Sequence, residues 1–182
     1  MSAENKATTR GERLLYASQQ GHPDIVDAIL DAKNVSTDPN VRGDDGTTPL
    51  IYATYNGHTD IVDTLLEKGA DPNLKTKTDG NTALVYASHS DQLMVANALL
   101  KHKANPNIEN RFGNTALDYA TEGRMHDLLV ENGGTAGSSS NRASRVTQME
   151  NRGAVRNFSR HRSYRRKSAP KRTKRNRQNR RA

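Results

Sequence analysis

The sequence predicts an all-α repeat solenoid followed by a tail without regular structure, and two observations predict it. The first is a period near 33 residues, since Gly46, Gly80 and Gly113 are separated by 34 and 33 residues. A fixed period of this length is typical of stacked helical repeats. The second is the distribution of aliphatic residues, which recur in clusters over residues 11–134 and almost vanish from residue 135 onward. A segment with so few apolar side chains cannot bury a core.

The net charge divides the chain at the same place. Residues 1–135 hold 12 Lys and Arg against 19 Asp and Glu, a net charge of −7. Residues 136–182 hold 16 Lys and Arg against one Glu, a net charge of +15. The overall charge of +8 therefore averages an acidic body and a basic tail. We expect the two parts to serve separate functions, joined by a flexible Gly/Ser linker at residues 135–140.

Each repeat begins with a tight turn and a first helix. Asp45-Gly46 is a turn dipeptide, because Gly accepts a positive φ angle without steric cost. Thr48 is placed to cap a helix, and Pro49 is placed to occupy its first position. Gly57 is expected to end this helix in a left-handed conformation.

A second helix follows at once. Thr59 and Asp60 open it, with the carboxylate near the positive end of the helix dipole. Apolar residues then recur at helical spacing and predict a packing face, namely Ile61, Val62, Leu65 and Leu66. Residues 69–73 (GADPN) end this helix and lead the chain into the next loop.

Residues 45–73 resemble the ankyrin repeat, since they meet its pattern D-G-x-T-P-L, a small Ala, G-H, I-V-x-x-L-L and G-A-D-P-N almost in full. The resemblance covers residues 11–134. It implies helix-turn-helix units with β-hairpin loops, and a concave face of hairpin tips and first helices that binds other proteins. The His that commonly follows T-P-L in this family is replaced here by Ile51, Val85 and Asp118.

Differences between the units predict their places in the stack. Repeat 3 has Asp91 where repeat 2 has Gly57, and Asp still accepts a left-handed conformation. Repeat 4 is shorter by one helical turn between Ala120 and Leu128. The expected boundaries are residues 1–10 for a disordered N-terminus, 11–42 for repeat 1 as N-terminal cap, 43–76 for repeat 2, 77–109 for repeat 3, 110–134 for repeat 4 as C-terminal cap, and 135–182 for a disordered tail.

The sequence predicts no catalytic residue, no metal site and no cofactor. The chain has no Cys, which excludes thiol catalysis and thiolate metal ligands. It contains no G-x-S-x-G, H-E-x-x-H or P-loop motif. His22 and His58 follow Gly at the same repeat position, which indicates a structural role at the turn. No stretch reaches the roughly 18 apolar residues of a spanning helix, so we expect no membrane contact.

We expect a protein partner to contact exposed residues that lie outside the repeat pattern. On the hairpin tips and at the ends of the first helices these are Asp44, Asp45, Tyr55, Asn56, Asp79, Asn81, His89, Arg111 and Phe112. Tyr55 and Phe112 are the best candidates for anchors, because aromatic residues dominate interface hot spots. For Tyr55 an equal alternative is that its ring lies over the neighbouring unit.

Basic clusters in the tail predict a nuclear-import signal for importin. They consist of Arg165, Arg166, Lys167, Lys171, Arg172, Lys174 and Arg175. The same charge allows contact with nucleic-acid phosphates, and Arg-rich segments often fold on RNA. A third alternative is an export signal, because positively charged C-termini resemble those of substrates of bacterial type IV secretion, and ankyrin proteins occur among such effectors.

The leading hypothesis is a monomeric, non-enzymatic adaptor that binds another protein through its repeats. Its tail would direct it to the nucleus, so we expect it in the cytoplasm, the nucleus or both. One rival is a nucleic-acid-associated protein that binds RNA or DNA through the tail. The other is a bacterial or viral effector that acts in a host cell.

Overall fold

The computed structural model describes residues 9–32 and 36–139, which all fall in one compact unit of the chain. Their helices are α1 (Arg10–Gln20), α2 (Pro23–Leu30), α3 (Pro49–Asn56), α4 (Thr59–Glu67), α5 (Ala83–His89), α6 (Leu93–Lys101), α7 (Ala116–Tyr119) and α8 (Arg124–Glu131). No β-strand occurs in these described residues.

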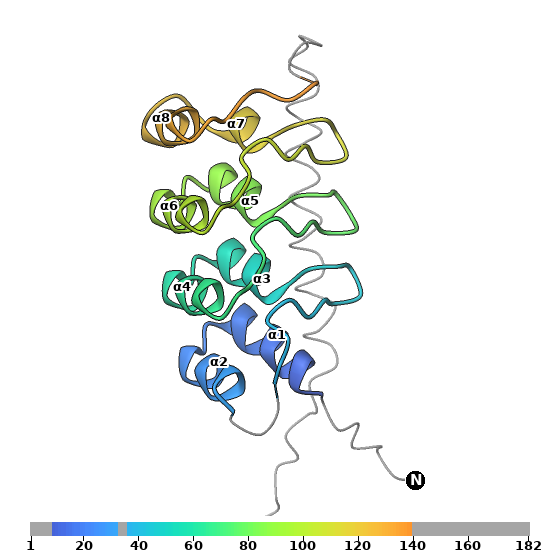
Figure 1. Ribbon diagram of the computed structural model, residues 1–182. Helices are drawn as coiled ribbons and strands as arrows, with labels where there is room; N and C mark the ends of the chain where they lie inside the picture. Colours follow the sequence, from blue (N-terminus) through green and yellow to red (C-terminus); the bar gives the residue numbers. More distant parts are fainter. Residues whose placement is uncertain (1–8, 33–35, 140–182) are drawn as a thin grey trace, which may run out of the picture. The chain divides into compact units, whose positions relative to one another are not determined.

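The helices form four pairs that stack one on another (Figure 1). The first helices α1, α3, α5 and α7 pack in one column, and the second helices α2, α4, α6 and α8 pack in another. Three loops project from the stack to one side, and we name them finger 1 (residues 41–48), finger 2 (74–82) and finger 3 (108–115). The predicted all-α repeat solenoid is therefore confirmed, and its hairpin loops are tight fingers without regular strands.

Hydroxyl side chains begin the first helices, as the sequence predicts. Thr48 Oγ1 accepts a hydrogen bond from Ile51 N at 3.3 Å. Helix α1 begins at Arg10, one residue before the expected start of repeat 1. The reason is a capping box, in which Thr9 and Glu12 each accept a bond from the other's backbone N–H.

Left-handed residues end the first helices. Gly57 has φ 76° after α3, as predicted. Asp91 occupies the same position after α5 with φ 51°, which confirms that Asp takes the left-handed conformation here. His58 N then donates to Ala53 O at 2.9 Å, so the chain reverses directly into the second helix.

The core lies between the two columns of helices. The predicted packing face of α4 is confirmed, since Ile61, Val62 and Leu65 have no exposed surface. Ala53 and Ala87 are equally buried, and their small side chains let the first helices approach closely. Truncation of a buried aliphatic side chain to Ala costs about 2–5 kcal/mol, so this core supplies much of the stability.

A ladder of Asn side chains ties each repeat to the next. Asn73 Oδ1 accepts from Asn105 N at 2.7 Å, and Asn73 Nδ2 donates to Lys103 O at 3.3 Å. Asn40 and Asn107 make the same pair of contacts with the units that follow them. The recurrence of Asn at the end of each D-P-N or N-P-N segment therefore has a structural cause, because each amide supplies both a donor and an acceptor.

Repeat 4 is shorter than the others, as predicted. Helix α7 has 4 residues, whereas α3 has 8. The chain leaves α7 at Ala120 in an extended conformation, with φ −70° and ψ 130°. Repeat 4 therefore presents less helix to the end of the stack than a full repeat would.

Residues 135–139 differ from the sequence expectation of a free linker, and we name them the C-terminal strap. Thr135 N donates to Asn107 Oδ1 at 2.7 Å, and Gly137 N donates to Asp118 Oδ2 at 2.7 Å. Gly137 is required, because a Cβ atom there would lie 2.2 Å from Gly113 O. The strap takes the place of a fifth unit, and composition alone hides this role because its small polar residues resemble a linker.

Candidate partner-binding surface

The fingers are closed turns that require Gly. Gly46 has φ 78° and Gly80 has φ 74°, which side chains rarely tolerate. In finger 1, Gly43 N donates to Thr47 O and Gly46 N donates to Gly43 O, both at 2.9 Å. Each finger therefore has a defined conformation at its tip.

Backbone hydrogen bonds also join neighbouring fingers. Lys77 N donates to Asp45 O at 2.8 Å, and Arg111 N donates to Asp79 O at 2.9 Å. The C-terminal strap continues this pattern, since Ser139 N bonds to finger 3 at 3.0 Å. The fingers thus form one continuous surface along the stack.

Asp79 and Asn81 correct the sequence expectation, because both are buried rather than exposed at the tip of finger 2. Their exposed fractions are 5% and 1%. Asp79 Oδ2 accepts from Tyr86 Oη at 3.0 Å and from Asn81 Nδ2 at 2.9 Å, and Asp79 Oδ1 accepts from the Thr76 hydroxyl. A carboxylate can be buried only when such donors satisfy it. These two side chains therefore serve the fold and are not available to a partner.

The same polar network continues into repeat 4. Asn110 Nδ2 donates to Asn81 Oδ1 and to Tyr119 Oη, both at 2.8 Å. Burial raises the pKa of the Tyr86 phenol, and the nearby Asp79 carboxylate raises it further. Burial also raises the pKa of Tyr119. Both phenols therefore keep their protons to a higher pH than a solvent-exposed Tyr, and their hydrogen bonds hold the fingers against the first helices.

Aromatic contacts between repeats confirm the alternative interpretation of Tyr55, in which its ring lies over the neighbouring unit. Its ring packs edge-on against Tyr86 of the next repeat, with centroids 5.8 Å apart and planes at 88°. His89 repeats the contact with Tyr119 at 6.0 Å. Tyr55 is half-buried and His89 is exposed, so each ring supports the stack and also presents part of its surface to solvent.

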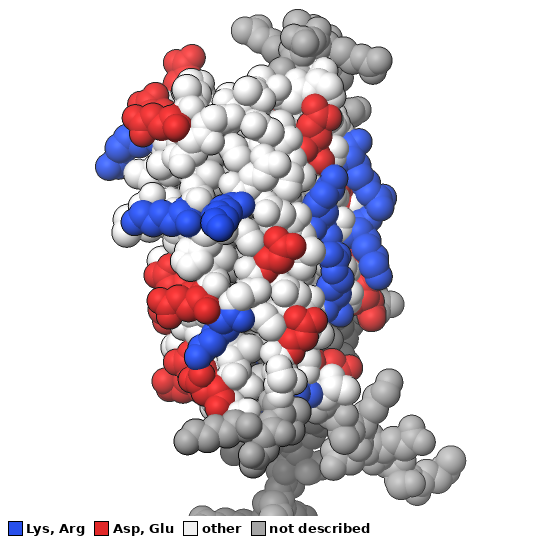
Figure 2. Space-filling view, in the orientation of Figure 1, with Lys and Arg blue, Asp and Glu red and all other residues white. Residues whose placement is uncertain are grey.

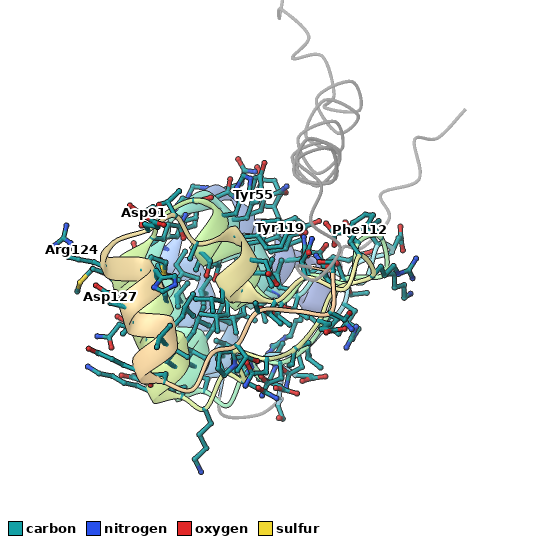
Figure 3. The ribbon with its side chains drawn as sticks, turned by 90° about the horizontal axis from the view of Figure 1, so that it is seen from above. Tyr55, Asp91, Phe112, Tyr119, Arg124 and Asp127 are labelled. Atoms are coloured by element: carbon teal, nitrogen blue, oxygen red, sulfur yellow. The ribbon has the colours of Figure 1, made fainter. Side chains whose placement is uncertain are left out.

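The remaining predicted residues lie on the finger side or at the end of α3. Asp44, Arg111 and Phe112 are exposed, whereas Asp45 and Asn56 are half-buried. Phe112 is 43% exposed, and its backbone N donates to Asn110 Oδ1 at 2.9 Å. Seen down the stack, Phe112 lies on the finger side, and Arg124 and Asp127 lie on the opposite side, on α8 (Figure 3). The structure thus brings Arg111 and Phe112 together on a rigid loop.

Sequence reasoning missed three cations of this surface. Arg42, Lys75 and Lys77 are exposed on fingers 1 and 2. Figure 2 shows Lys and Arg side chains gathered along the finger side of the stack. A signal for two of them existed in the repeat register, since Arg42 and Lys75 each stand two residues after an Asn of the ladder.

Other predictions concern metal binding, membranes and the tail. Across residues 9–32 and 36–139, no group of three His, Asp or Glu is arranged to hold a metal ion. Over the same ranges no helix is long and apolar enough to cross a membrane. The predicted import residues lie outside the described part of the chain, namely Arg165, Arg166, Lys167, Lys171, Arg172, Lys174 and Arg175.

Comparison with known families agrees with this architecture. The sequence profile described as ankyrin repeats (3 copies) matches residues 3–76 and 69–139, which include every described helix, the fingers and the C-terminal strap. No curated protein matches the chain. Because the matched residues make up well over half of the sequence and the helix pairs stack as the repeat requires, the chain belongs to the ankyrin repeat family.

Proposed function

We propose that this chain is a non-enzymatic, monomeric adaptor that binds another protein through its fingers and first helices. Ankyrin repeats are generally protein–protein interaction modules. The observation that carries the proposal is Phe112, whose side chain is 43% exposed on a backbone that Asn110 fixes. An exposed aromatic side chain on a rigid loop suits an interface anchor, because little conformational freedom is lost on binding.

The proposed contact set follows from exposure and position. It consists of Asp44, Asp45, Tyr55, Asn56, His89, Arg111 and Phe112, which are all exposed or half-buried. Arg111 stands directly before Phe112, and Arg is also enriched at interface hot spots. The second helices carry the opposite side of the stack, so they provide a matched control surface.

Affinity capture from a cell lysate tests this assignment. The full chain serves as bait beside a double variant, Arg111→Ala with Phe112→Ala, and a control variant, Met94→Ala. Met94 is 71% exposed on α6, so its truncation changes exposed apolar area away from the fingers. We expect a protein that the wild type and Met94→Ala recover and that the double variant loses. Equal recovery by the double variant, with an unchanged thermal melt, would remove the finger side as the binding surface.

We further propose that the basic tail is a nuclear-import signal recognised by importin. The support is its composition, since clusters of Lys and Arg are typical of such signals. The full chain, fused to two tandem fluorescent proteins to prevent passive entry, is compared in cultured cells with a chain that ends after Ser139. We expect nuclear accumulation that is lost on truncation and with Lys171, Arg172, Lys174 and Arg175 changed to Gln. An equal distribution of all three proteins would exclude an import signal.

A second candidate function for the tail is nucleic-acid binding, which its net charge of +15 favours. Binding of the chain to RNA and to DNA, measured over a series of salt concentrations, separates nucleic-acid binding from nuclear import. Binding that survives at physiological salt and disappears after truncation at Ser139 would support this candidate. Absence of binding by the full chain at that salt would remove it.

A further inference from the structure

Four cations form a row along the fingers, and we name Arg42, Lys75, Lys77 and Arg111 the finger row. All four side chains are exposed. Figure 2 shows basic side chains gathered on this side of the stack. Arg42 and Lys75 occupy the same place in successive repeats, as do Lys77 and Arg111, so the row follows the period of the stack.

The finger row is held by the fingers beneath it. Arg42 Nη1 donates to Lys75 O at 3.1 Å, and Lys75 Nζ donates to Glu109 O at 2.8 Å. These bonds place each head group over the following finger. Their acceptors are neutral carbonyls, so the bonds orient the cations without cancelling their charge.

The turn glycines make room for the aliphatic stems of the Lys77 and Arg111 side chains. A Cβ on Gly46 would lie 2.7 Å from Lys77 Cγ, and a Cβ on Gly80 would lie 3.1 Å from Arg111 Cγ. Each stem therefore lies directly over the turn of the preceding finger. The C-terminal strap takes this place over the last finger, since a Cβ on Gly113 would lie 2.7 Å from Ser138 Oγ. The row thus ends where the strap begins.

Within the described residues, no carboxylate forms an ion pair with the row. In the described part of the chain, ion pairs of Lys or Arg with a carboxylate are confined to Lys68 and Asp31 on the second-helix side. Glu109 lies beside the row, but its two carboxylate oxygens accept from Ser138 N at 2.7 Å and from Ser138 Oγ at 3.0 Å. Asp79 is buried within its hydrogen-bond network. Over fingers 2 and 3, the three exposed cations Lys75, Lys77 and Arg111 therefore outnumber the one exposed carboxylate, Glu109, whereas on finger 1 the exposed Asp44 lies near Arg42 in the sequence.

We infer that the finger row binds an extended acidic peptide segment of the protein partner, with an apolar residue of that segment against Phe112. The inference rests on the proposed function and specifies the chemistry of its partner. Carboxylates spaced along an extended chain complement cations spaced along the stack, and such complementarity sets specificity and association rate. Phe112 adjoins the last cation of the row and offers apolar surface beside it.

A nucleic acid fits the row less well. Residues 1–135 carry a net charge of −7, and a long polyphosphate would meet this field beyond the row. A short peptide contacts the row alone, since charges more than about 8–10 Å away are screened at physiological salt. Proteins that bind single-stranded nucleic acids commonly offer successive aromatic platforms, whereas Phe112 is the one aromatic residue of the three fingers.

Position-resolved NMR tests the inference with a defined probe. The isotope-labelled full chain is titrated with a short peptide of alternating Glu and Ala with one central Phe, and with its Gln counterpart. Because the tail of +15 attracts any acidic peptide, the readout is restricted to the backbone amides of fingers 2 and 3. We expect these amides to shift with the Glu peptide and not with the Gln peptide.

Two charge-matched variants provide the comparison. One changes the finger row to Gln, and the other changes four exposed cations elsewhere to Gln, namely Lys68, Lys101, Lys103 and Arg124. We expect roughly tenfold weaker binding at the fingers for the row variant, since exposed ion pairs contribute modestly each, and an unchanged affinity for the control. Should the row variant melt early, Lys77→Gln with Arg111→Gln keeps the carbonyl bonds of Arg42 and Lys75 and serves instead.

Three outcomes would overturn the inference. The first is a response confined to residues 140–182, and the second is an equal response of wild type and row variant. The third is an equal response of the fingers to a single-stranded DNA of matched charge at the same salt. If shifts fall on α3 and α5 instead, only the finger row fails and the proposed adaptor function stands.

Discussion

Lys103 holds a backbone angle that side chains rarely adopt, with φ 66°, at the position where repeat 2 has Gly69 with φ 84°. A left-handed conformation costs a residue other than Gly roughly 1–2 kcal/mol. Replacing Lys103 with Gly removes this cost, but the larger entropy of Gly in the unfolded chain offsets part of the gain in stability. We therefore expect Lys103→Gly to raise the free energy of unfolding by about 0.5–1 kcal/mol, measured by urea denaturation.

A matched substitution inside a helix should act in the opposite direction. Lys101 is exposed at the end of α6 in a helical conformation. Lys101→Gly should lower the free energy of unfolding by about 0.5–1 kcal/mol, because Gly is a poor helix former. Loss of stability of similar size in both variants would contradict the argument from backbone strain at residue 103.

The Tyr86 phenol predicts a pH dependence at the alkaline end. Burial and Asp79 raise its pKa in the folded state, so the folded protein keeps this proton where the unfolded chain loses it, above about pH 10. The contribution of Tyr86 to stability is complete below that pH and declines above it by up to about 1.4 kcal/mol per pH unit. Urea midpoints over roughly pH 9 to 11 should thus fall more steeply for wild type than for Tyr86→Phe. Parallel curves would show that the phenol is not held neutral.

At the level of single residues, the sequence predicted conformations better than contacts. Gly57 and Asp91 were predictable because a left-handed helix end restricts the choice of residue. The burial of Asp79 was not predictable. An Asp exposed at the tip of a turn and a buried Asp that accepts four hydrogen bonds, as Asp79 does, can have the same local sequence. What decides between them is Tyr86, seven residues away, whose hydroxyl reaches back to the carboxylate.

Among the structural elements, the Asn ladder gives the sharpest prediction. Asn73→Ala removes both ladder bonds between repeat 2 and repeat 3, and we expect it to cost about 1–3 kcal/mol. Hydrogen exchange provides a local readout, since the Asn105 amide loses its acceptor and should exchange faster than in wild type. The control is Asn97→Ala within α6, where Ala favours the helix and the Asn105 amide keeps its acceptor. Unchanged protection of Asn105 in Asn73→Ala would exclude a stabilising ladder.

The helices themselves could be predicted almost fully from the sequence, whereas their connections could not. The apolar spacing of Ile61, Val62 and Leu65 defines a packing face, and these residues are buried as that spacing requires. The C-terminal strap has no such periodicity. Its role depends on backbone N–H groups of Thr135 and Gly137 meeting acceptors more than fifteen residues earlier, which no local pattern reveals.

For the molecule as a whole, the C-terminal strap marks the end of the folded repeat stack. We expect a chain cut after Ser139 to keep the urea midpoint of the full chain. A chain cut after Gly134 loses the bonds of Thr135, Gly137 and Ser139, and should unfold with about 1–3 kcal/mol less free energy. Equal midpoints for the two shortened chains would show that the strap contributes nothing to the fold.

The central claim at this scale is that the finger side of the repeat stack binds a protein. Hydrogen exchange of the full chain, alone and in complex with the protein that it captures, tests this most directly. We predict slower exchange in fingers 2 and 3 and at the ends of α3 and α5, with little change in α2, α4, α6 and α8. Slower exchange confined to the second helices or to residues 140–182 would contradict it.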